Sequence, residues 1–341
     1  MLISDIARAV GCLWTAGGAI SRVVTDSRQA GPETLFVAIV GDRLDGNDFA
    51  AQALAAGAPA VVVSRRAEGV DPARAIEVPD TKRALIQIGG LYRERFSIPM
   101  VGVTGSVGKT TTKEFIHAVL SAKYNTHKNE GNQNNELGVP NTLFALEPTH
   151  QAAVVEMGMS DFGEIHALSM AVRPAVGVIT AIGVSHIERL GSRENILKAK
   201  LELLDGLTPG APLLLCGDNE LLARVRDDRF TILLYGLTNP ENQIRAEKIV
   251  SRENATSFEI LSPWGEYSAK IPTVGQHNVL DALAAFAVGC VMGVEPAAAA
   301  AALANYLPTG MRQKMISWKG ATLVEDCYNC SPDSLRAAAL T

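Results

Sequence analysis

The sequence predicts an α/β protein: a small N-terminal α/β domain, followed by a P-loop-type, mainly parallel sheet with helices on both faces. Short apolar runs alternate with helical segments through most of the 341 residues, as in parallel sheets covered by helices. One such run, "IPMVGVTG" (98–105), opens into a Gly-rich turn and a helix. The length also fits two or three domains rather than one.

Residues 1–82 form the first predicted domain. Its first 14 residues are typical of a short amphipathic helix and lack the basic start and apolar core of a signal peptide. Two β-rich runs, 35–41 and 60–64, flank a helical segment at 48–58, which predicts a strand–helix–strand unit. Residues 80–96 predict a connecting helix.

Residues 83–312 form the central predicted domain. A helix is expected over about 110–122 and apolar strands over 152–158, 175–183 and 211–217. Residues 245–272 alternate polar and apolar side chains around a "PWGE" turn, which predicts antiparallel strands added to the sheet. Helices follow at 274–293 and 295–307, the second with Pro296 in its first turn.

Residues 313–341 predict only a strand (321–330) and a helix (331–340). Because one strand and one helix cannot bury a core of their own, we expect two domains plus the first piece of a third.

Composition narrows the functional classes. The formal charge of −5 disfavours nucleic acid and anionic membranes as partners, and no apolar run reaches the ~18 residues of a membrane span. The five cysteines are scattered, which is typical of reduced thiols in a soluble, cytoplasmic protein. Cys327 and Cys330 form a C-x-x-C, but no second pair stands at zinc spacing, so we expect no metal or redox chemistry there.

The segment 104–111, "TGSVGKTT", predicts a phosphate-binding loop. Val103 stands where the strict G-x-x-x-x-G-K-[ST] pattern has its first Gly. An apolar strand, a Gly-rich turn and a helix that begins with Lys109 and Thr110 would still aim backbone N–H groups and an ammonium at an anion. The Thr110 hydroxyl would serve Mg²⁺. The alternative is a Gly-rich turn without a ligand.

Three further side chains are candidates for chemistry. Glu156 ends a strand at the sheet edge where ligands gather, and could hold Mg²⁺; otherwise it is a solvated strand-end carboxylate. His186 follows the next strand in the same way, or is a structural histidine. Lys200 lies 14 residues further on, and spacing alone leaves it an ordinary exposed helix lysine.

Polar side chains also occur close together in the segment 130–142. Asn134, Asn135 and Glu136 could contact a polar substrate or simply form a turn. Asn278 is expected to be a helix N-cap if it has no ligand.

Taken together, these segments resemble the Mur ligases, ATP-dependent enzymes of peptidoglycan precursor synthesis. The resemblance runs through essentially the whole chain, in the order and spacing of its motifs. Its phosphate loop has the form T-G-x-x-G-K-T-T, which fits Thr104 to Thr111. The other matching segments are "TDSRQAGPETLFVAIVGDRLDGNDF", "GNQNNELGVP", "EMGMSDFGEI", "SHIERLGSRENILKAKLELL", "GQHNVLDALAA" and "DCYNCSPDS".

The resemblance implies a role for each matching position. The ATP site would comprise Thr104, Gly105, Ser106, Val107, Gly108, Lys109, Thr110, Thr111, Asn278, Arg312 and Asp326. The metal sites would comprise Thr110, Glu156, His186 and Lys200, with Lys200 carbamylated by CO₂. Lys109, Lys200 and His186 would be catalytic. The UDP-sugar peptide would contact Ser27, Arg28, Asp45, Gly46, Asn134, Asn135 and Glu136.

The implied activity joins D-Ala-D-Ala to UDP-MurNAc-tripeptide through an acyl phosphate, with ATP and Mg²⁺, in a cytoplasmic and monomeric enzyme. A sister ligase that adds one amino acid or a recycled peptide is the nearest alternative. A non-catalytic nucleotide or UDP-sugar binding module and a simple P-loop ATPase or kinase are the others.

Three features depart from the family. Asp281 replaces its usual Asn, and "YNCSP" replaces "YNANP". Only the start of the family's Rossmann-like C-terminal domain is present, so we expect a shortened, poorly active form.

Overall fold

The computed structural model describes residues 1–252, 254–319, 321–329, 332 and 335–336. It divides the chain into two compact units. The small unit comprises Met1–Ser97 together with Asn135–Leu146. The large unit comprises Ile98–Asn134 and the residues from Glu147 onward. The fold class expected from the sequence is confirmed: a small α/β unit precedes a larger unit with a mixed sheet.

The small unit is built on a parallel sheet in the order β1-β2-β3-β4. Its strands are β1 (Arg22–Val24), β2 (Thr34–Val37), β3 (Ala60–Val63) and β4 (Ala75–Glu77). Side chains alternate between the two faces, as the pleat requires. Leu35 and Val37 join a core with α1 (Ile3–Ala9) and α3 (Thr81–Arg93), whereas Phe36 joins a core with α2 (Ala50–Ala55).

Helix α3 belongs to the small unit and binds a segment from further along the chain. The Asp80 carboxylate caps α3 by accepting from the Lys82 and Arg83 N–H groups. Helix α5 (Gly138–Phe144) packs against α3 where Gly89 allows a close approach to Pro140. The compact small unit therefore extends past residue 82, where the sequence placed the domain boundary.

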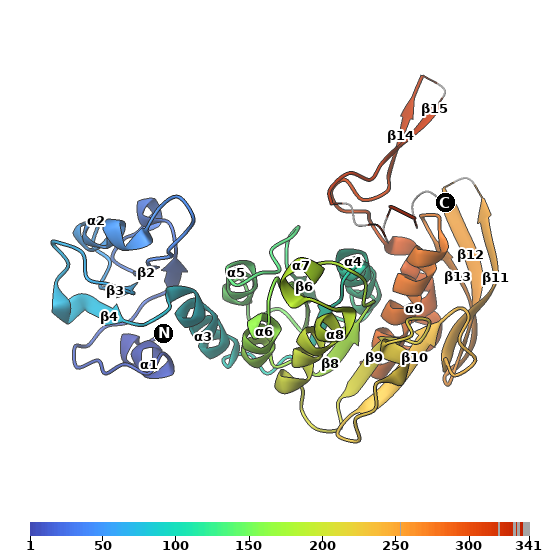
Figure 1. The fold of residues 1–341 in the computed structure, drawn as a ribbon, viewed down its shortest axis with the longest axis horizontal. Helices are drawn as coiled ribbons and strands as arrows, with labels where there is room; N and C mark the ends of the chain where they lie inside the picture. Colours follow the sequence, from blue (N-terminus) through green and yellow to red (C-terminus); the bar gives the residue numbers. More distant parts are fainter. Residues whose placement is uncertain (253, 320, 330–331, 333–334, 337–341) are drawn as a thin grey trace. The chain divides into compact units, whose positions relative to one another are not determined.

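The large unit contains a sheet in the order β13-β12-β11-β10-β9-β8-β5-β7-β6 (Figure 1). It is parallel from β6 to β11, and antiparallel between β11, β12 and β13, as predicted for residues 245–272. The strands are β5 (Met100–Thr104), β6 (Thr126–Lys128), β7 (Ala152–Glu156), β8 (Val176–Ile179), β9 (Pro212–Cys216), β10 (Thr231–Gly236), β11 (Ile244–Arg252), β12 (Ala255–Ser262) and β13 (Gly265–Ile271).

Helices pack against this sheet and against one another. They are α4 (Lys109–Leu120), α6 (Glu164–Val172), α7 (Ile187–Leu190), α8 (Arg193–Leu201), α9 (Gln276–Val291) and α10 (Pro296–Ala302). Gly289 lets α9 approach α4 closely, since a Cβ there would lie 2.4 Å from a methyl carbon of Val119. Pro296 occupies the first turn of α10, as predicted.

A hairpin of β14 (Lys314–Trp318) and β15 (Ala321–Glu325) follows α10. The strand predicted over 321–330 is thus found in its first half, with β14 as an additional partner. Most of the helix predicted over 331–340 lies outside the described residues, as does Cys330 of the C-x-x-C. In the part of the chain that the structure describes, no helix is both long and apolar enough to cross a membrane.

Candidate active site

Three parallel strands bring the predicted site together. β5 pairs with β7 on one side and with β8 on the other, so the chain leaves β5 where the strand order reverses. In open parallel sheets, the crevice at the carboxyl ends of such strands is the usual ligand site. The phosphate loop follows β5, Glu156 ends β7, and His186 comes after β8. The sheet topology therefore gathers groups that lie up to 80 residues apart.

The phosphate loop is held by contacts that only glycine permits. Gly105 has φ +149°, and a Cβ there would lie 2.0 Å from the Thr180 hydroxyl oxygen. Gly108 is the N-cap of α4 with φ +83°, a left-handed conformation that favours glycine. The Lys109 Nζ donates to the carbonyl oxygens of Gly105 (2.8 Å) and Ser106 (3.3 Å). The lysine thus lies over the loop that begins its own helix.

Glu156 is a buried carboxylate, not the solvated strand-end residue of the alternative interpretation. It is 1% exposed, and Oε1 accepts from the Asn134 amide at 2.7 Å. Oε2 has no hydrogen-bond partner among the described residues, although Lys113 Nζ lies 3.8 Å away. Asn129 fixes the backbone of Glu156 with two hydrogen bonds, of 2.8 and 2.9 Å. Glu156 therefore presents one oxygen free to bind a ligand.

Lys113 is a residue that the sequence interpretation missed. It lies one turn after Lys109 on α4 and is fully buried. Its Nζ donates to the carbonyl oxygens of Asn129 (2.8 Å) and Gly131 (3.2 Å). The spacing of four residues from Lys109 was the available signal, because it places both side chains on one face of the helix.

Lys109, His186 and Lys200 form a cluster of basic groups. Burial lowers the pKa of Lys109 and of His186, and for His186 the positive charges of Lys200 and Lys109 lower it further. Burial, followed by the charge of Lys109, lowers the pKa of Lys200 well below its usual range. Such a cluster is electrostatically suited to an anion, which would relieve the repulsion.

Lys200 is 1% exposed, which contradicts the alternative of an exposed helix lysine. The 3-10 turn η4 (Glu202–Gly206), which follows α8, packs against the sheet. Gly102 and Gly177, paired on β5 and β8, leave a depression that Leu203 fills. The Glu202 carboxylate accepts from the N–H groups of Gly163 (2.8 Å) and His166 (3.1 Å) at the start of α6.

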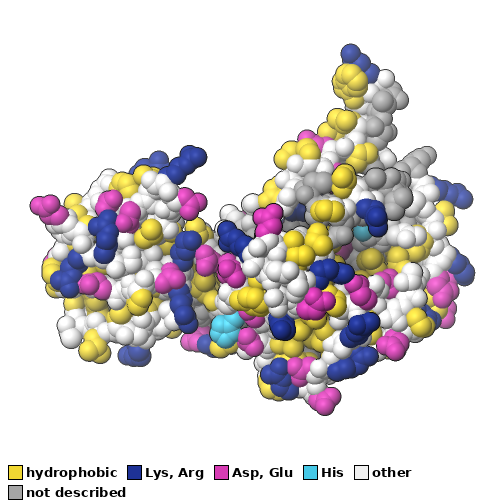
Figure 2. Space-filling view, viewed as in Figure 1, with side chains coloured by type: hydrophobic (Ala, Val, Ile, Leu, Met, Phe, Trp, Pro, Cys, Tyr) yellow, Lys and Arg dark blue, Asp and Glu magenta, His cyan; other side chains and the backbone are white. Residues whose placement is uncertain are grey.

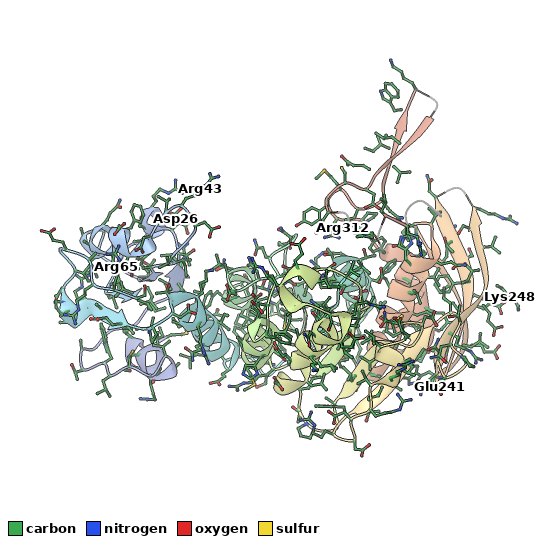
Figure 3. All side chains as sticks on the ribbon, viewed as in Figure 1. Asp26, Arg43, Arg65, Glu241, Lys248 and Arg312 are labelled. Carbon is green, nitrogen blue, oxygen red and sulfur yellow. The ribbon has the colours of Figure 1, made fainter. Side chains whose placement is uncertain are left out.

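A cavity of about 180 Å³ adjoins the phosphate loop. Val107, Gly108 and Thr111 line it from the loop, and Asn278, Arg312 and Asp326 line it from the other side, as expected of a nucleoside site. Arg312 lies at the base of the β14–β15 hairpin (Figure 3) and its guanidinium stacks 4.5 Å from the Tyr328 ring centroid.

Asn278 is not a helix N-cap, so that interpretation was wrong. Gly275 is the N-cap of α9, and Asn278 lies within the helix. Its amide instead donates to the Val274 carbonyl oxygen (2.7 Å) and to Gln313 Oε1 (2.6 Å). The side chain therefore ties α9 to the segment that precedes β14.

The predicted UDP-sugar residues of the small unit share one edge of its sheet. Ser27 and Arg28 lie in the turn η1 (Ser27–Gln29) after β1, and Asp45 caps the turn η2 (Gly46–Phe49), which follows β2. Neighbouring parallel strands end at the same edge. Arg65 lies just after β3 (Figure 3). It pairs with Asp45 at 2.7 Å and was not singled out from the sequence. This edge carries both acidic and basic groups.

Asn135 and Glu136 have local partners within the small unit. Asn135 Oδ1 accepts from the N–H groups of Leu137 (3.2 Å) and Gly138 (2.9 Å) at the start of α5. Glu136 pairs with Lys82 at 3.4 Å. Of the candidates Asn134, Asn135 and Glu136, Asn134 is the one whose side chain contacts Glu156.

Charge is mixed over the rest of the molecule. On the face that Figure 2 shows, acidic and basic side chains are interspersed over each unit. This pattern agrees with the formal charge of −5 and with a binding site that is local.

The side chains of this site suit a metal ion that takes only some of its ligands from the protein and the others from a bound substrate. Among the described residues, no three His, Cys, Asp or Glu side chains form a metal cage. Mg²⁺ commonly takes one or two carboxylates together with substrate phosphates and waters. The buried Glu156 Oε2 beside the phosphate loop suits that arrangement.

The fold and this site define an α/β protein of the phosphate-loop type. Residues 103–289 match the Mur ligase middle domain, and residues 19–92 match the Mur ligase family, catalytic domain. The chain belongs to the Mur ligase family, whose members are ATP-dependent, ADP-forming ligases that make C–N bonds.

Similar proteins and solved structures support this family assignment. The UDP-N-acetylmuramoyl-tripeptide–D-alanyl-D-alanine ligase of Bacillus subtilis is 41% identical over 94% of this chain and 69% of the relative. That of Escherichia coli is 33% identical over 94% and 71%. The crystal structure of MurF from Acinetobacter baumannii has a TM-score of 0.89 and 31% identity, over 99% of this chain and 75% of that one. MurF from Thermotoga maritima in complex with ADP has a TM-score of 0.85 and 28% identity, over 93% and 73%.

Proposed function

We propose that this chain joins D-alanyl-D-alanine to UDP-MurNAc-tripeptide with ATP, the reaction named for its B. subtilis relative. The observation that carries the proposal is the buried Glu156 carboxylate at the end of β7, the strand that pairs with β5 where the phosphate loop begins. This is a cytoplasmic step of peptidoglycan precursor synthesis, carried out by a monomer.

The reaction has two steps. A carboxylate oxygen of the tripeptide attacks the γ-phosphorus of ATP, which gives an acyl phosphate and ADP. The amine of D-Ala-D-Ala then attacks the acyl carbon. The nitrogen loses a proton, and the tetrahedral intermediate expels phosphate and leaves an amide. Because negative charge accumulates on phosphoryl oxygens, positioning and charge neutralisation are the main tasks of the protein.

The phosphate loop performs the first task. Its N–H groups, from Thr104 to Thr111, and the Lys109 ammonium bind the ATP phosphates. Asn278, Arg312 and Asp326 hold the nucleoside in the adjoining cavity. Mg²⁺, when bound by Thr110, Glu156 and His186 with the phosphates, would neutralise charge on the transferring group.

Lys200 supplies a further ligand as a carbamate. A neutral amine attacks CO₂ through its lone pair and loses one proton, and the lowered pKa of Lys200 favours the neutral form. The product is an anion beside Lys109, so a repulsion becomes an attraction.

Two sets of residues are proposed to contact the second substrate. Ser27, Arg28, Asp45 and Gly46 bind the UDP part at the carboxyl edge of the small sheet. Asn134, Asn135 and Glu136 bind the peptide part. The Asn134 contact with Glu156 would couple substrate binding to the metal ligand.

The test is an assay of ADP release with MgATP, UDP-MurNAc-tripeptide and D-Ala-D-Ala. It should use this chain, and also this chain fused to the C-terminal part of the B. subtilis relative that lies beyond the match. We expect ADP release to require both co-substrates, and Lys109→Met to weaken ATP binding by about 10- to 100-fold through loss of a charged hydrogen bond.

Other amines distinguish the alternatives. Release supported by L-alanine or diaminopimelate instead of D-Ala-D-Ala would identify a sister ligase. Release without any amine would identify a simple ATPase, and tight ATP binding without turnover in the fused protein would identify a binding module.

A further inference from the structure

A buried carboxyl group faces the cavity beside the phosphate loop. Asp281, on α9, lines this cavity together with Gly108 and Thr111 of the loop region. A nucleotide whose phosphates occupy the loop places its nucleoside in this adjoining space. Asp281 is therefore positioned to contact a base, and this inference rests on the nucleotide site of the proposed function.

The contacts of Asp281 fix one of its oxygens and leave the other available. Oδ1 accepts from the Thr112 hydroxyl at 2.7 Å, and a Cβ on Gly108 would lie 2.8 Å from the same oxygen. Oδ2 makes no hydrogen bond to the described residues, and the side chain is 7% exposed. A mostly buried carboxyl group that lines a cavity is placed to meet a ligand there.

The surroundings disfavour a negative charge on this carboxyl. Burial is the largest influence on it, and Arg312 is the positively charged side chain that opposes burial. The titratable and charged groups around it are Arg312 before β14, Cys216 at the end of β9, Tyr235 on β10, Tyr306 after α10, His277 on α9 and Asp326 after β15.

We propose that the neutral carboxyl of Asp281 reads the adenine base, donating to a ring nitrogen and accepting from the N6 amine. Adenine offers one acceptor and one donor side by side, which is why the amide of Asn matches it. A neutral carboxyl also offers one donor and one acceptor, whereas a carboxylate only accepts and would face the ring nitrogen with like polarity. Adenine binding therefore requires the proton on Asp281.

The pKa of Asp281 makes this requirement observable. Burial raises it from 3.8 to about 7, against the opposing effect of the Thr112 hydrogen bond. The neutral fraction then falls from about 0.9 at pH 6 to about 0.09 at pH 8, and apparent affinity scales with the competent fraction. Adenine nucleotide binding should weaken about tenfold over this range.

The test compares ADP binding to the unmodified chain and to Asp281→Asn by calorimetry from pH 6 to pH 8. The Asn amide keeps the shape, the donor and the acceptor but does not titrate. We expect the ratio of the two affinities to change about tenfold. Titration of the ADP phosphate is common to both proteins and cancels in this ratio.

Proton uptake gives a second readout that needs no variant. In buffers of different ionisation enthalpy, the unmodified chain should take up close to one proton per ADP bound at pH 8 beyond the uptake by Asp281→Asn. Thr112→Val removes the hydrogen bond that lowers the pKa, so the loss of affinity should move to higher pH.

The outcomes separate the two claims. If ADP binds and the affinity ratio is constant with pH, Asp281 does not read the base as a neutral acid, and the inference is overturned while the nucleotide site stands. If neither protein binds ADP at any pH, the proposed function fails and the inference fails with it.

Discussion

Lys200 illustrates what one side chain contributes at the residue scale. Burial favours the neutral form of an amine, and Lys200 is 1% exposed. Its pKa therefore lies well below the usual 10.5, so the folded chain binds a proton at Lys200 less tightly than the unfolded chain does. A reactive neutral amine is thus obtained at the expense of stability, as is common at functional sites.

The stability of Lys200→Met should reveal this cost. The unfolded chain binds the proton up to pH 10.5 while the folded chain does not, so stability of the unmodified protein rises with pH over this window. We expect the variant to have the higher melting temperature, with a difference at pH 7 that shrinks towards pH 10. Calorimetric scans at both values measure it.

The exposed neighbour Lys198 provides the matched control. Lys198→Met should leave the melting temperature unchanged at either pH. A melting-temperature gain in Lys200→Met that does not vary with pH would mean that packing, rather than the proton, is responsible.

At the scale of the element, the start of α4 depends on one backbone conformation. Gly108 and Gly163 are the N-caps of α4 and α6, and both have φ +83° and ψ −15°. They differ in their surroundings. A Cβ at Gly108 would meet Asp281 Oδ1 at 2.8 Å, whereas a Cβ at Gly163 would meet nothing within 4 Å. The two caps separate the conformational cost of alanine from crowding.

Alanine at the two positions should therefore behave differently. Gly163→Ala should cost about 1–2 kcal/mol of stability from the left-handed backbone alone, with ADP affinity unchanged. Gly108→Ala should cost more and should also weaken ADP binding by roughly tenfold or more, through displaced loop N–H groups. Urea unfolding and calorimetry measure the two effects, and equal costs would show that the contact with Asp281 is unimportant.

At the scale of the whole molecule, the small unit is discontinuous in sequence. Residues 135–146 return from the large unit to pack on α3. Leu143 is 1% exposed and lies against Gly89, and the Tyr92 hydroxyl donates to the Leu146 carbonyl oxygen at 3.2 Å. The integrity of the small unit therefore depends on a segment about 40 residues beyond its first part.

Leu143→Ala should destabilise the small unit selectively. We expect a loss of about 2–5 kcal/mol, seen as faster hydrogen exchange in β2 and β3 with little change in β9 and β10. Leu215→Ala, in the core of β9, should produce the reverse pattern. Uniform acceleration in both units after Leu143→Ala would contradict the division into separate units.

Much of this architecture was predictable because it is encoded locally. The apolar runs of β2, β3, β5, β7, β8 and β9, and the alternation in β11–β13, are periodic signals within single elements. The short edge strands β1, β4 and β6 were missed because three residues carry no period. Helix α5 was missed because the residues just before it, such as Asn135, have a turn-like composition.

By itself, the sequence determined the fold class, the phosphate loop and the kind of residue that stands at each strand end. Only the tertiary structure decided the protonation and partners of those residues. Asp281 meets Thr112 across 169 positions, and Lys200 is 1% exposed although its local sequence is that of an ordinary surface helix. Burial and electrostatic environment are sums over segments that are distant in the chain, and no local pattern contains them.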